Sequence, residues 1–152
     1  MTGGRFNRKG EATLYLSLDV MTSFRECTQG FTNRLQPLTM CEYDVDCADV
    51  ADLRADAGRL AYRVDLAELD CPWLTLQLSG KQAPSWLVVD RLKAQGQVGM
   101  LVPSFVPGAS ANNINLVLWQ WGPDLPHRVA VFDPSGRLPA NQLSWPKLKS
   151  DK

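Results

Sequence analysis

The first alternating stretch of the chain lies directly behind its glycine-rich start. In ATLYLS, residues 12–17, Leu14 and Leu16 face one way, and the alternate positions face the other: Thr13, Tyr15 and Ser17. Such alternation is typical of a half-buried β-strand, because successive side chains of a strand point to opposite faces. The pattern therefore predicts a short strand over residues 12–17, preceded by the loop GGRFNRKG.

A helical pattern follows this strand. Asp19 suits a helix N-cap, because its carboxylate can accept a hydrogen bond from a backbone N–H of the first turn. The apolar residues after it recur at intervals of four, three and four positions: Val20, Phe24, Cys27 and Phe31. This spacing predicts an amphipathic helix with one apolar face. Gly30 is expected to loosen or end this helix.

In the middle of the chain, the pattern of apolar and polar residues predicts two strands and three helical segments. Alternation over residues 38–46 indicates a strand, and a second, shorter strand is expected over residues 49–53. Between residues 65 and 79 the pattern is broken by Pro72, so two short helical pieces are expected there. The clearest helix is PSWLVVDRLKAQG, residues 84–96, which has proline at its start and glycine at its end.

The last third of the chain is rich in predicted strands. Three apolar runs, over residues 98–104, 114–121 and 128–133, are separated by loops that contain proline, glycine and asparagine. No internal repeat and no linker interrupts the chain. The elements therefore predict a single α+β domain over residues 1–152, with a polar tail over residues 140–152.

Composition and charge narrow the possible functions. The chain has 152 residues, of which 45% are apolar and 21% charged, and its formal net charge is zero. These are ordinary values for one globular domain. A neutral chain argues against nucleic-acid binding, which requires a basic surface. The sequence lacks any run of about 18 apolar residues and any signal-peptide pattern at its start, so we expect no membrane association and a cytoplasmic location.

The residues that usually bind metals are too dispersed to predict a metal site. The chain has four cysteines, none of them in a CxxC pair, and His127 is its only histidine. A zinc site needs clustered ligands at short spacing, so reduced thiols are the simpler interpretation. His127 is expected to be structural. The sequence also lacks the GxSxG, P-loop and GxGxxG motifs.

Two polar residues near the start are candidates for binding a ligand. Arg5 follows two glycines, which let a backbone approach a ligand closely, and its guanidinium suits a phosphate or carboxylate. A flexible terminus with a solvated arginine fits the same spacing. Tyr15 lies on the strand face opposite Leu14 and Leu16 and could stack on a flat ring. A core tyrosine with a satisfied hydroxyl fits equally.

Three further residues are candidates because of where they fall in their elements. Glu26 is displaced by roughly a third of a turn from the apolar stripe of its helix, at a position where a carboxylate can enter a cleft. A solvated glutamate is the alternative. Ser104 ends one predicted strand and Asn115 begins the next, where each could meet a ligand at the end of a sheet. Turn and cap roles are the alternative for both.

Taken together, these segments resemble the RES-domain proteins, a family named for an arginine, a glutamate and a serine. The segments that carry the resemblance are, in chain order, GGRFNRKG, LYLS, the helix with Glu26, VPS, NLVLW and FDPSGRLP. They extend over residues 3–139, nearly the whole chain. The GGRFN and LYLS block with Glu26 downstream is the most specific part of the resemblance.

The resemblance implies a fold and an activity. The fold is that of ADP-ribosyltransferases such as diphtheria toxin, with a mixed sheet and flanking helices. The activity is that of the toxin in a bacterial toxin–antitoxin pair. Such toxins consume NAD by hydrolysis or phosphorolysis of the nicotinamide–ribose bond, or transfer ADP-ribose to a protein. NAD is then a substrate and no metal is required. The expected partner is an Xre-like helical antitoxin that covers the active site.

By position in the resembling motifs, the functional residues of the family correspond to Arg5, Tyr15, Glu26, Ser104 and Asn115. Glu26 is expected to stabilise the positive charge of an oxocarbenium-like transition state. Arg5 is expected to hold the pyrophosphate or a ribose-side oxygen, and Tyr15 to stack on or flank the nicotinamide ring. Ser104 and Asn115 are expected to hydrogen-bond the nicotinamide amide or the ribose hydroxyls.

Two alternatives stay open at the level of the sequence. The acceptor could be a side chain of a cellular protein instead of water or phosphate, because the donor site is the same. The domain could also be a non-catalytic module that only binds the antitoxin. The short start motivates this second alternative. The family usually has a further strand before the GGR motif, whereas only two residues precede Gly3 here, so one wall of the cleft is expected to be lacking.

Overall fold

A computed structural model describes residues 3–28 and 38–138 of the chain. These residues form five helices and six strands in an α+β arrangement, with the following bounds: β1 (Leu14–Ser17), α1 (Val20–Thr28), β2 (Glu42–Cys47), β3 (Val50–Asp52), α2 (Asp56–Tyr62), α3 (Leu66–Leu69), α4 (Trp73–Leu78), α5 (Pro84–Ala94), β4 (Gly99–Pro103), β5 (Ile114–Leu118) and β6 (His127–Phe132). The predicted α+β class and single domain are confirmed.

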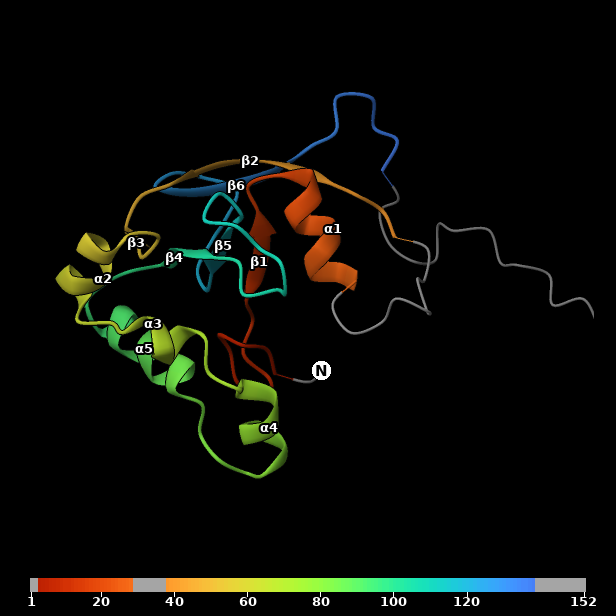
Figure 1. The fold of residues 1–152 in the computed structure, drawn as a ribbon. Coiled ribbons are helices and arrows are strands. Elements are labelled where there is room, and N and C mark those ends of the chain that lie inside the picture. The colour runs from red at the N-terminus through yellow and green to blue at the C-terminus, as the bar shows by residue number, and fades with distance from the viewer. Residues whose placement is uncertain (1–2, 29–37, 139–152) are drawn as a thin grey trace, which may run out of the picture.

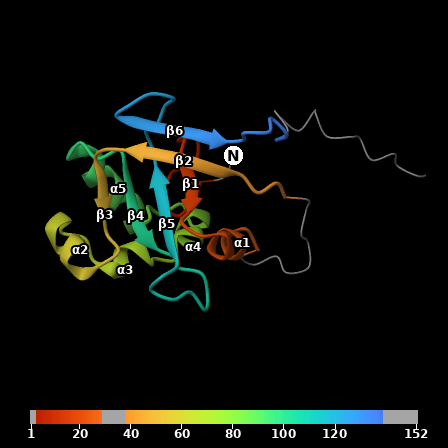
Figure 2. The same cartoon turned by 90° about the horizontal axis from the view of Figure 1, so that it is seen from above.

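The strands form two sheets. A four-stranded sheet has the order β1-β5-β4-β3, in which β3 and β4 are parallel and the other pairs antiparallel. Strands β2 and β6 pair antiparallel in a separate two-stranded sheet. Figure 1 shows this two-stranded sheet on one side of the four-stranded sheet and helices α3, α4 and α5 on the other. The view from above shows β2 and β6 running across the direction of β1, β4 and β5 (Figure 2). The mixed sheet expected from the sequence is therefore present.

The main core lies between the four-stranded sheet and helix α5. Met100, Val102 and Val117 project from the helix-covered face of the sheet and are fully buried. The apolar residues of α5 that pack on them include Val88 and Leu92, which are four positions apart and so share one helix face. Because this core fixes α5 and β5 relative to each other, it provides a rigid base for the loops at the ends of these elements.

Most elements follow the local pattern, but one helix was not predicted. Helix α2 contains Gly58 in its first half, and a glycine inside a helix lowers its intrinsic stability by roughly 0.5–1 kcal/mol. The fold requires glycine there, because a Cβ at this position would lie 1.9 Å from the backbone oxygen of Asp52 at the end of β3. The close packing of α2 on the backbone of β3 is a tertiary contact, and local periodicity cannot predict it.

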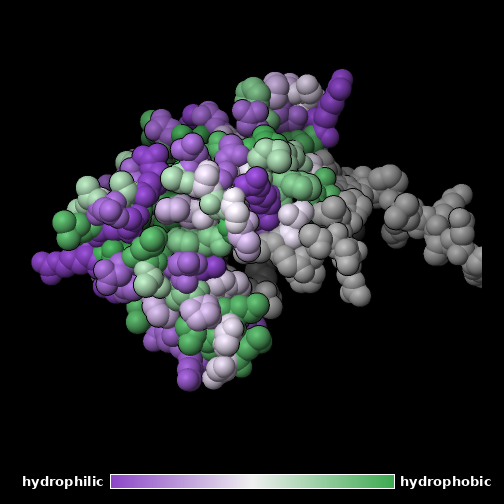
Figure 3. Space-filling model, in the orientation of Figure 1, coloured by the Kyte–Doolittle hydropathy of each residue, from purple (hydrophilic) through white to green (hydrophobic). Residues whose placement is uncertain are grey.

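Helix α1 buries its polar side, whereas its amphipathic pattern suggests that the apolar side is buried. Its apolar stripe is exposed, with Val20 at 63% and Phe24 at 44%, whereas Thr22 is completely buried. The last residue of the predicted stripe, Phe31, lies outside the described residues. The polar side of α1 faces inward because Thr22 and Glu26 hydrogen-bond to residues around β4 and β5. Apolar surface is visible over α1, and also over α4, in Figure 3.

None of the helices in the described residues combines the length and the hydrophobicity needed to cross a membrane.

Candidate active site

A cavity of about 330 Å³ opens where the N-terminal loop, β1, α1, α4 and β5 meet. Its polar lining comes from side chains far apart in the sequence: Arg5, Tyr15, Ser17, Ser23, Glu26 and Asn115. Aromatic rings supply much of the remaining wall: Phe6, Trp73 and Phe105. A concave, largely apolar site with a few convergent polar groups is the usual form of a small-molecule site. Of the five residues expected from the sequence, only Ser104 does not line this cavity.

The Glu26 carboxylate is held at the cavity wall by two neutral donors. Ser104 Oγ donates a hydrogen bond to Glu26 Oε1 at 2.7 Å, and Asn115 Nδ2 donates to the same oxygen at 2.5 Å. Ser104 is buried, and its oxygen also accepts a hydrogen bond from Val106 N at 3.4 Å. Ser104 therefore supports the carboxylate from inside the protein. The structure brings Glu26, Ser104 and Asn115 together from α1, the end of β4 and β5.

The N-terminal end of α1 is anchored by a second group of hydrogen bonds. Asp19 caps the helix as expected, because its Oδ1 accepts a bond from Thr22 N at 2.8 Å, and its Oδ2 accepts one from Thr22 Oγ1 at 2.5 Å. These bonds lower the pKa of the Asp19 carboxyl. Asn113 Nδ2 in turn donates to Thr22 Oγ1 at 2.7 Å. Because Thr22 and Glu26 are one turn apart on the same helix face, this anchor also fixes Glu26.

Arg5 is fixed in place, unlike the solvated arginine of a frayed terminus. Its Nη1 donates to the backbone oxygens of Leu69 and Cys71 at 3.1 and 3.0 Å, at the connection between α3 and α4. The guanidinium lies 3.6 Å from Asp70 Oδ1 and 5.0 Å from the centre of the Phe105 ring. These contacts hold a positive charge at the edge of the cavity. They also join the N-terminal loop to the helical side of the molecule.

Tyr15 presents its ring to the cavity while its hydroxyl is occupied. The hydroxyl accepts a hydrogen bond from Phe6 N at 3.1 Å and donates one to Asn7 Oδ1 at 2.7 Å. Burial raises the pKa of Tyr15 to about 12, although 44% of the residue as a whole is exposed. Tyr15 is therefore a neutral phenol at physiological pH. Its ring is available to contact a ligand, whereas its hydroxyl is hydrogen-bonded within the N-terminal loop.

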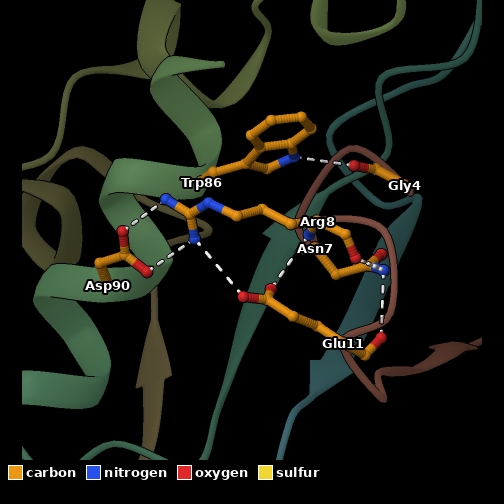
Figure 4. Close-up of polar contacts among 6 residues, drawn as sticks. All are labelled: Gly4, Asn7, Arg8, Glu11, Trp86 and Asp90. Carbon is orange, nitrogen blue, oxygen red and sulfur yellow. Dashed lines mark hydrogen bonds and ion pairs between the residues drawn. The ribbon is translucent and has the colours of Figure 1, made fainter. Parts of the chain in front are cut away.

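The N-terminal loop is closed on itself and fastened to α5 (Figure 4). Asn7 Nδ2 donates to the backbone oxygens of Arg8 and Glu11 at 3.0 and 3.3 Å. Trp86 Nε1 on α5 donates to Gly4 O at 2.9 Å. Arg8 forms two hydrogen bonds to the Asp90 carboxylate, at 3.0 and 2.7 Å, and its guanidinium lies 5.6 Å from the Trp86 ring centre. These bonds hold the loop that carries Arg5 in one conformation against α5.

The ion pair between Arg8 and Asp90 makes a pH-dependent contribution to stability. The guanidinium holds the pKa of the Asp90 carboxyl below its usual range. A lowered folded-state pKa means that the stabilisation is present above the unfolded-state pKa and is lost as the pH falls through the folded-state value. Because the Asp90 side chain is 45% exposed, solvent screening keeps the contribution small. Asp90→Asn should therefore cost about 0.5–1 kcal/mol at neutral pH.

Chemical denaturation at neutral and acidic pH tests this expectation. The difference in unfolding free energy between the wild-type protein and Asp90→Asn should shrink towards zero in acid. Asp124→Asn, at an exposed loop position, is the matched control and should change little at either pH. A difference for Asp90→Asn that is the same in acid as at neutral pH would contradict an electrostatic clamp.

Several residues of the site were missed by the sequence reasoning. Ser17 shares its strand face with Tyr15, so the alternation of β1 already placed it correctly, but nothing local marked it as functional. Asn7 acts by bonding Tyr15 across the loop, and no sequence period reports such a contact. Trp73 and Phe105 come from α4 and from the loop after β4, so only the tertiary fold brings them to the cavity.

The described residues do not place three or more histidine, cysteine, aspartate or glutamate side chains close enough together to hold a metal ion. Cys27, Cys41, Cys47 and Cys71 are all free thiols.

Comparison with known proteins identifies the family. The family model described as the RES domain matches residues 1–141 of the 152-residue chain. A search of curated proteins and a search of solved structures return no significant match. RES domains are known in toxin–antitoxin systems, and the family is associated with NAD-related enzymatic activity. The matched region includes the N-terminal loop, α1 and both strands that hold Glu26. The chain belongs to the RES domain family.

Proposed function

We propose that this protein is the toxin of a type II toxin–antitoxin pair and consumes NAD by cleaving its nicotinamide–ribose bond. The observation that carries the proposal is the Glu26 carboxylate, which two neutral donors hold at the wall of a cavity that also contains a fixed guanidinium and several aromatic rings. This combination matches the needs of a substrate with a cationic ring, a ribose and a pyrophosphate.

The proposed roles follow from the charge that develops during cleavage. As the bond between the ribose carbon and the nicotinamide nitrogen breaks, its electron pair leaves with nicotinamide and the ribose becomes oxocarbenium-like. The Glu26 carboxylate stabilises that positive charge and orients the attacking group. Both donors end on Oε1, so we assign Oε2 to the sugar. Nicotinamide departs as a neutral molecule, so the step needs no strong general acid.

The remaining cavity residues bind and orient the substrate in this proposal. Arg5 attracts the pyrophosphate or a ribose-side oxygen, since a guanidinium is always charged and donates several hydrogen bonds. The ring of Tyr15 flanks the nicotinamide, as expected from the sequence, because its hydroxyl is already bound in the loop. Asn115 and Ser104 hold Glu26, which gives them a different task from the direct ligand contacts expected from the sequence. Asn115 also lines the cavity and can reach the ligand.

Incubating the purified protein with NAD and measuring free nicotinamide tests the proposal. Hydrolysis gives ADP-ribose, whereas phosphorolysis requires phosphate and gives a phosphorylated ADP-ribose, so the assay is run with and without phosphate. Labelled NAD added to a bacterial lysate detects the alternative, transfer of ADP-ribose to a protein, as a labelled band. A folded protein that releases no nicotinamide and is not stabilised by NAD against heat would instead support a non-catalytic antitoxin-binding module.

The exposed apolar face of α1 supports the proposed antitoxin partner. Val20, Met21 and Phe24 are 63%, 59% and 44% exposed, on the side of α1 turned away from the face that carries Glu26. Contiguous apolar surface of this kind often marks a protein interface. The double variant Val20→Ser and Phe24→Ser should therefore weaken binding of an Xre-like antitoxin encoded beside this chain by about 1–3 kcal/mol, measured by calorimetry.

Leu60→Ser is the matched control for this binding experiment. Leu60 is 80% exposed on α2, away from the cavity, and its replacement should leave antitoxin binding unchanged. Undiminished binding of the α1 double variant would place the interface elsewhere on the domain.

A further inference from the structure

We propose that Ser17 is a positioning residue that sets the orientation of the Asn115 amide and, through it, of the Glu26 carboxylate. The inference rests on the proposed function, in which Glu26 stabilises the transition state. Ser17 lines the cavity, but its hydroxyl is directed to another side chain, because Ser17 Oγ donates a hydrogen bond to Asn115 Oδ1 at 2.7 Å.

The register of the sheet places these two side chains together. Ser17 and Asn115 are directly opposed in the antiparallel pairing of β1 with β5. Directly opposed residues project to the same face of a sheet, with their side chains in contact distance. The same pairing extends past the strand, because Leu18 N donates to Ile114 O at 3.0 Å just before α1 begins. The contact between Ser17 and Asn115 is therefore built into the strands that lead to Glu26.

The direction of the hydrogen bonds gives Ser17 its role. A primary amide has an acceptor end and a donor end, so a donor at Oδ1 favours the rotamer that turns Nδ2 elsewhere. Here Nδ2 faces Glu26 Oε1 at 2.5 Å. A rotated amide would place Oδ1 against the carboxylate, where two acceptors repel each other. In this series of hydrogen bonds, from Ser17 to Asn115 to Glu26, each donor points towards the carboxylate, and such aligned bonds strengthen one another.

The second support of Glu26 is independent of Ser17. Ser104 Oγ donates to Oε1 from the end of β4. Ser104 and Val106 are both buried, and Ser104 Oγ also accepts a hydrogen bond from Val106 N. Removing the Ser17 hydroxyl therefore leaves one of the two bonds to Glu26 in place. The expected effect is a loosened carboxylate in a folded protein, so activity should fall without being abolished.

Kinetics of a double-mutant cycle test the proposal. Ser17→Ala should lower kcat by about tenfold with little change in KM, and Ser17→Thr, which keeps a hydroxyl and suits a strand, should restore most of it. In an Asn115→Ala background, Ser17→Ala should have no further effect, because residues that act through one another are not additive. A further loss of similar size in that background would overturn the proposal in favour of direct contact with the substrate or a purely structural role.

A spectroscopic measurement separates this proposal from the proposed function. In ¹⁵N-labelled protein, the side-chain amide protons of Asn115 should shift or broaden in Ser17→Ala and resemble wild type in Ser17→Thr. Ser135→Ala, at an exposed position outside the cavity, is the control and should leave them unchanged. If wild-type protein releases no nicotinamide, the proposed function fails, and this measurement still tests Ser17. Unchanged Asn115 resonances in Ser17→Ala would refute the positioning role.

Discussion

Replacing Glu26 by glutamine should lower kcat for nicotinamide release by about 10²–10⁴-fold while the protein stays folded. The substitution keeps the size of the side chain and removes its charge. The glutamine carbonyl can still accept the hydrogen bonds that Ser104 Oγ and Asn115 Nδ2 make to Oε1 at 2.7 and 2.5 Å. Only the negative charge that would stabilise the oxocarbenium-like transition state is lost. KM for NAD should change much less than kcat, because the charge acts mainly in the transition state.

The control for this experiment is Glu42→Gln. Glu42 is an exposed glutamate on β2 and does not line the cavity, so its replacement should leave turnover unchanged. Circular dichroism and thermal unfolding of both variants establish that the fold is retained. A folded Glu26→Gln protein with nearly wild-type turnover would remove Glu26 from the mechanism, and with it the observation on which the proposed function rests.

A second large effect is expected from Gly4→Ala, one residue before Arg5. A Cβ at position 4 would lie 2.6 Å from Asn7 Oδ1 and 2.7 Å from the Tyr15 hydroxyl, far inside normal contact distances. The loop cannot move away easily, because Gly4 and Asn7 exchange backbone hydrogen bonds and Trp86 Nε1 bonds Gly4 O. The methyl group must therefore break the bond between Tyr15 and Asn7, which leaves partly buried polar groups without partners. We expect a cost of about 1–3 kcal/mol in unfolding free energy.

The effect of Gly4→Ala on activity should exceed its effect on stability. Displacement of Tyr15 and Arg5 by about 1 Å is enough to reduce catalysis roughly 10²-fold. Gly122→Ala is the matched control, because a Cβ there meets nothing within 4 Å. Thermal unfolding and nicotinamide release are measured for both variants. If Gly4→Ala proves as stable and as active as Gly122→Ala, the loop does not set the geometry of the site.

The sequence predicted most elements of this fold because their patterns are local. Alternation in β1 put Tyr15 and Ser17 on one face, Asp19 capped α1, and proline and glycine marked the ends of the α5 region. These features depend on neighbours within one or two turns, which a single sequence displays directly. The order of the motifs also indicated the RES domain family, which the family match confirms.

The local pattern could not decide which face of α1 is buried against the rest of the protein. Its apolar residues suggested one helix face, yet the buried residue is Thr22, and Val20 and Phe24 are exposed. The reason is that Asn113 and Asn115 belong to the segment around β5, far along the chain, and they offer hydrogen bonds only to the polar side of the helix. Satisfying partly buried polar groups outweighed the burial of a few apolar side chains.

The sequence by itself determined most of the strands and helices, though not α2, and the order in which Arg5, Tyr15 and Glu26 appear. Only the tertiary structure decided which residues hold the carboxylate. The bond from Ser104 to Glu26 spans 78 positions, the bond from Asn115 to Glu26 spans 89, and the bond from Ser17 to Asn115 spans 98. Contacts over such separations depend on strand register and on the packing of α1 against the sheet, which no periodicity within a short window encodes.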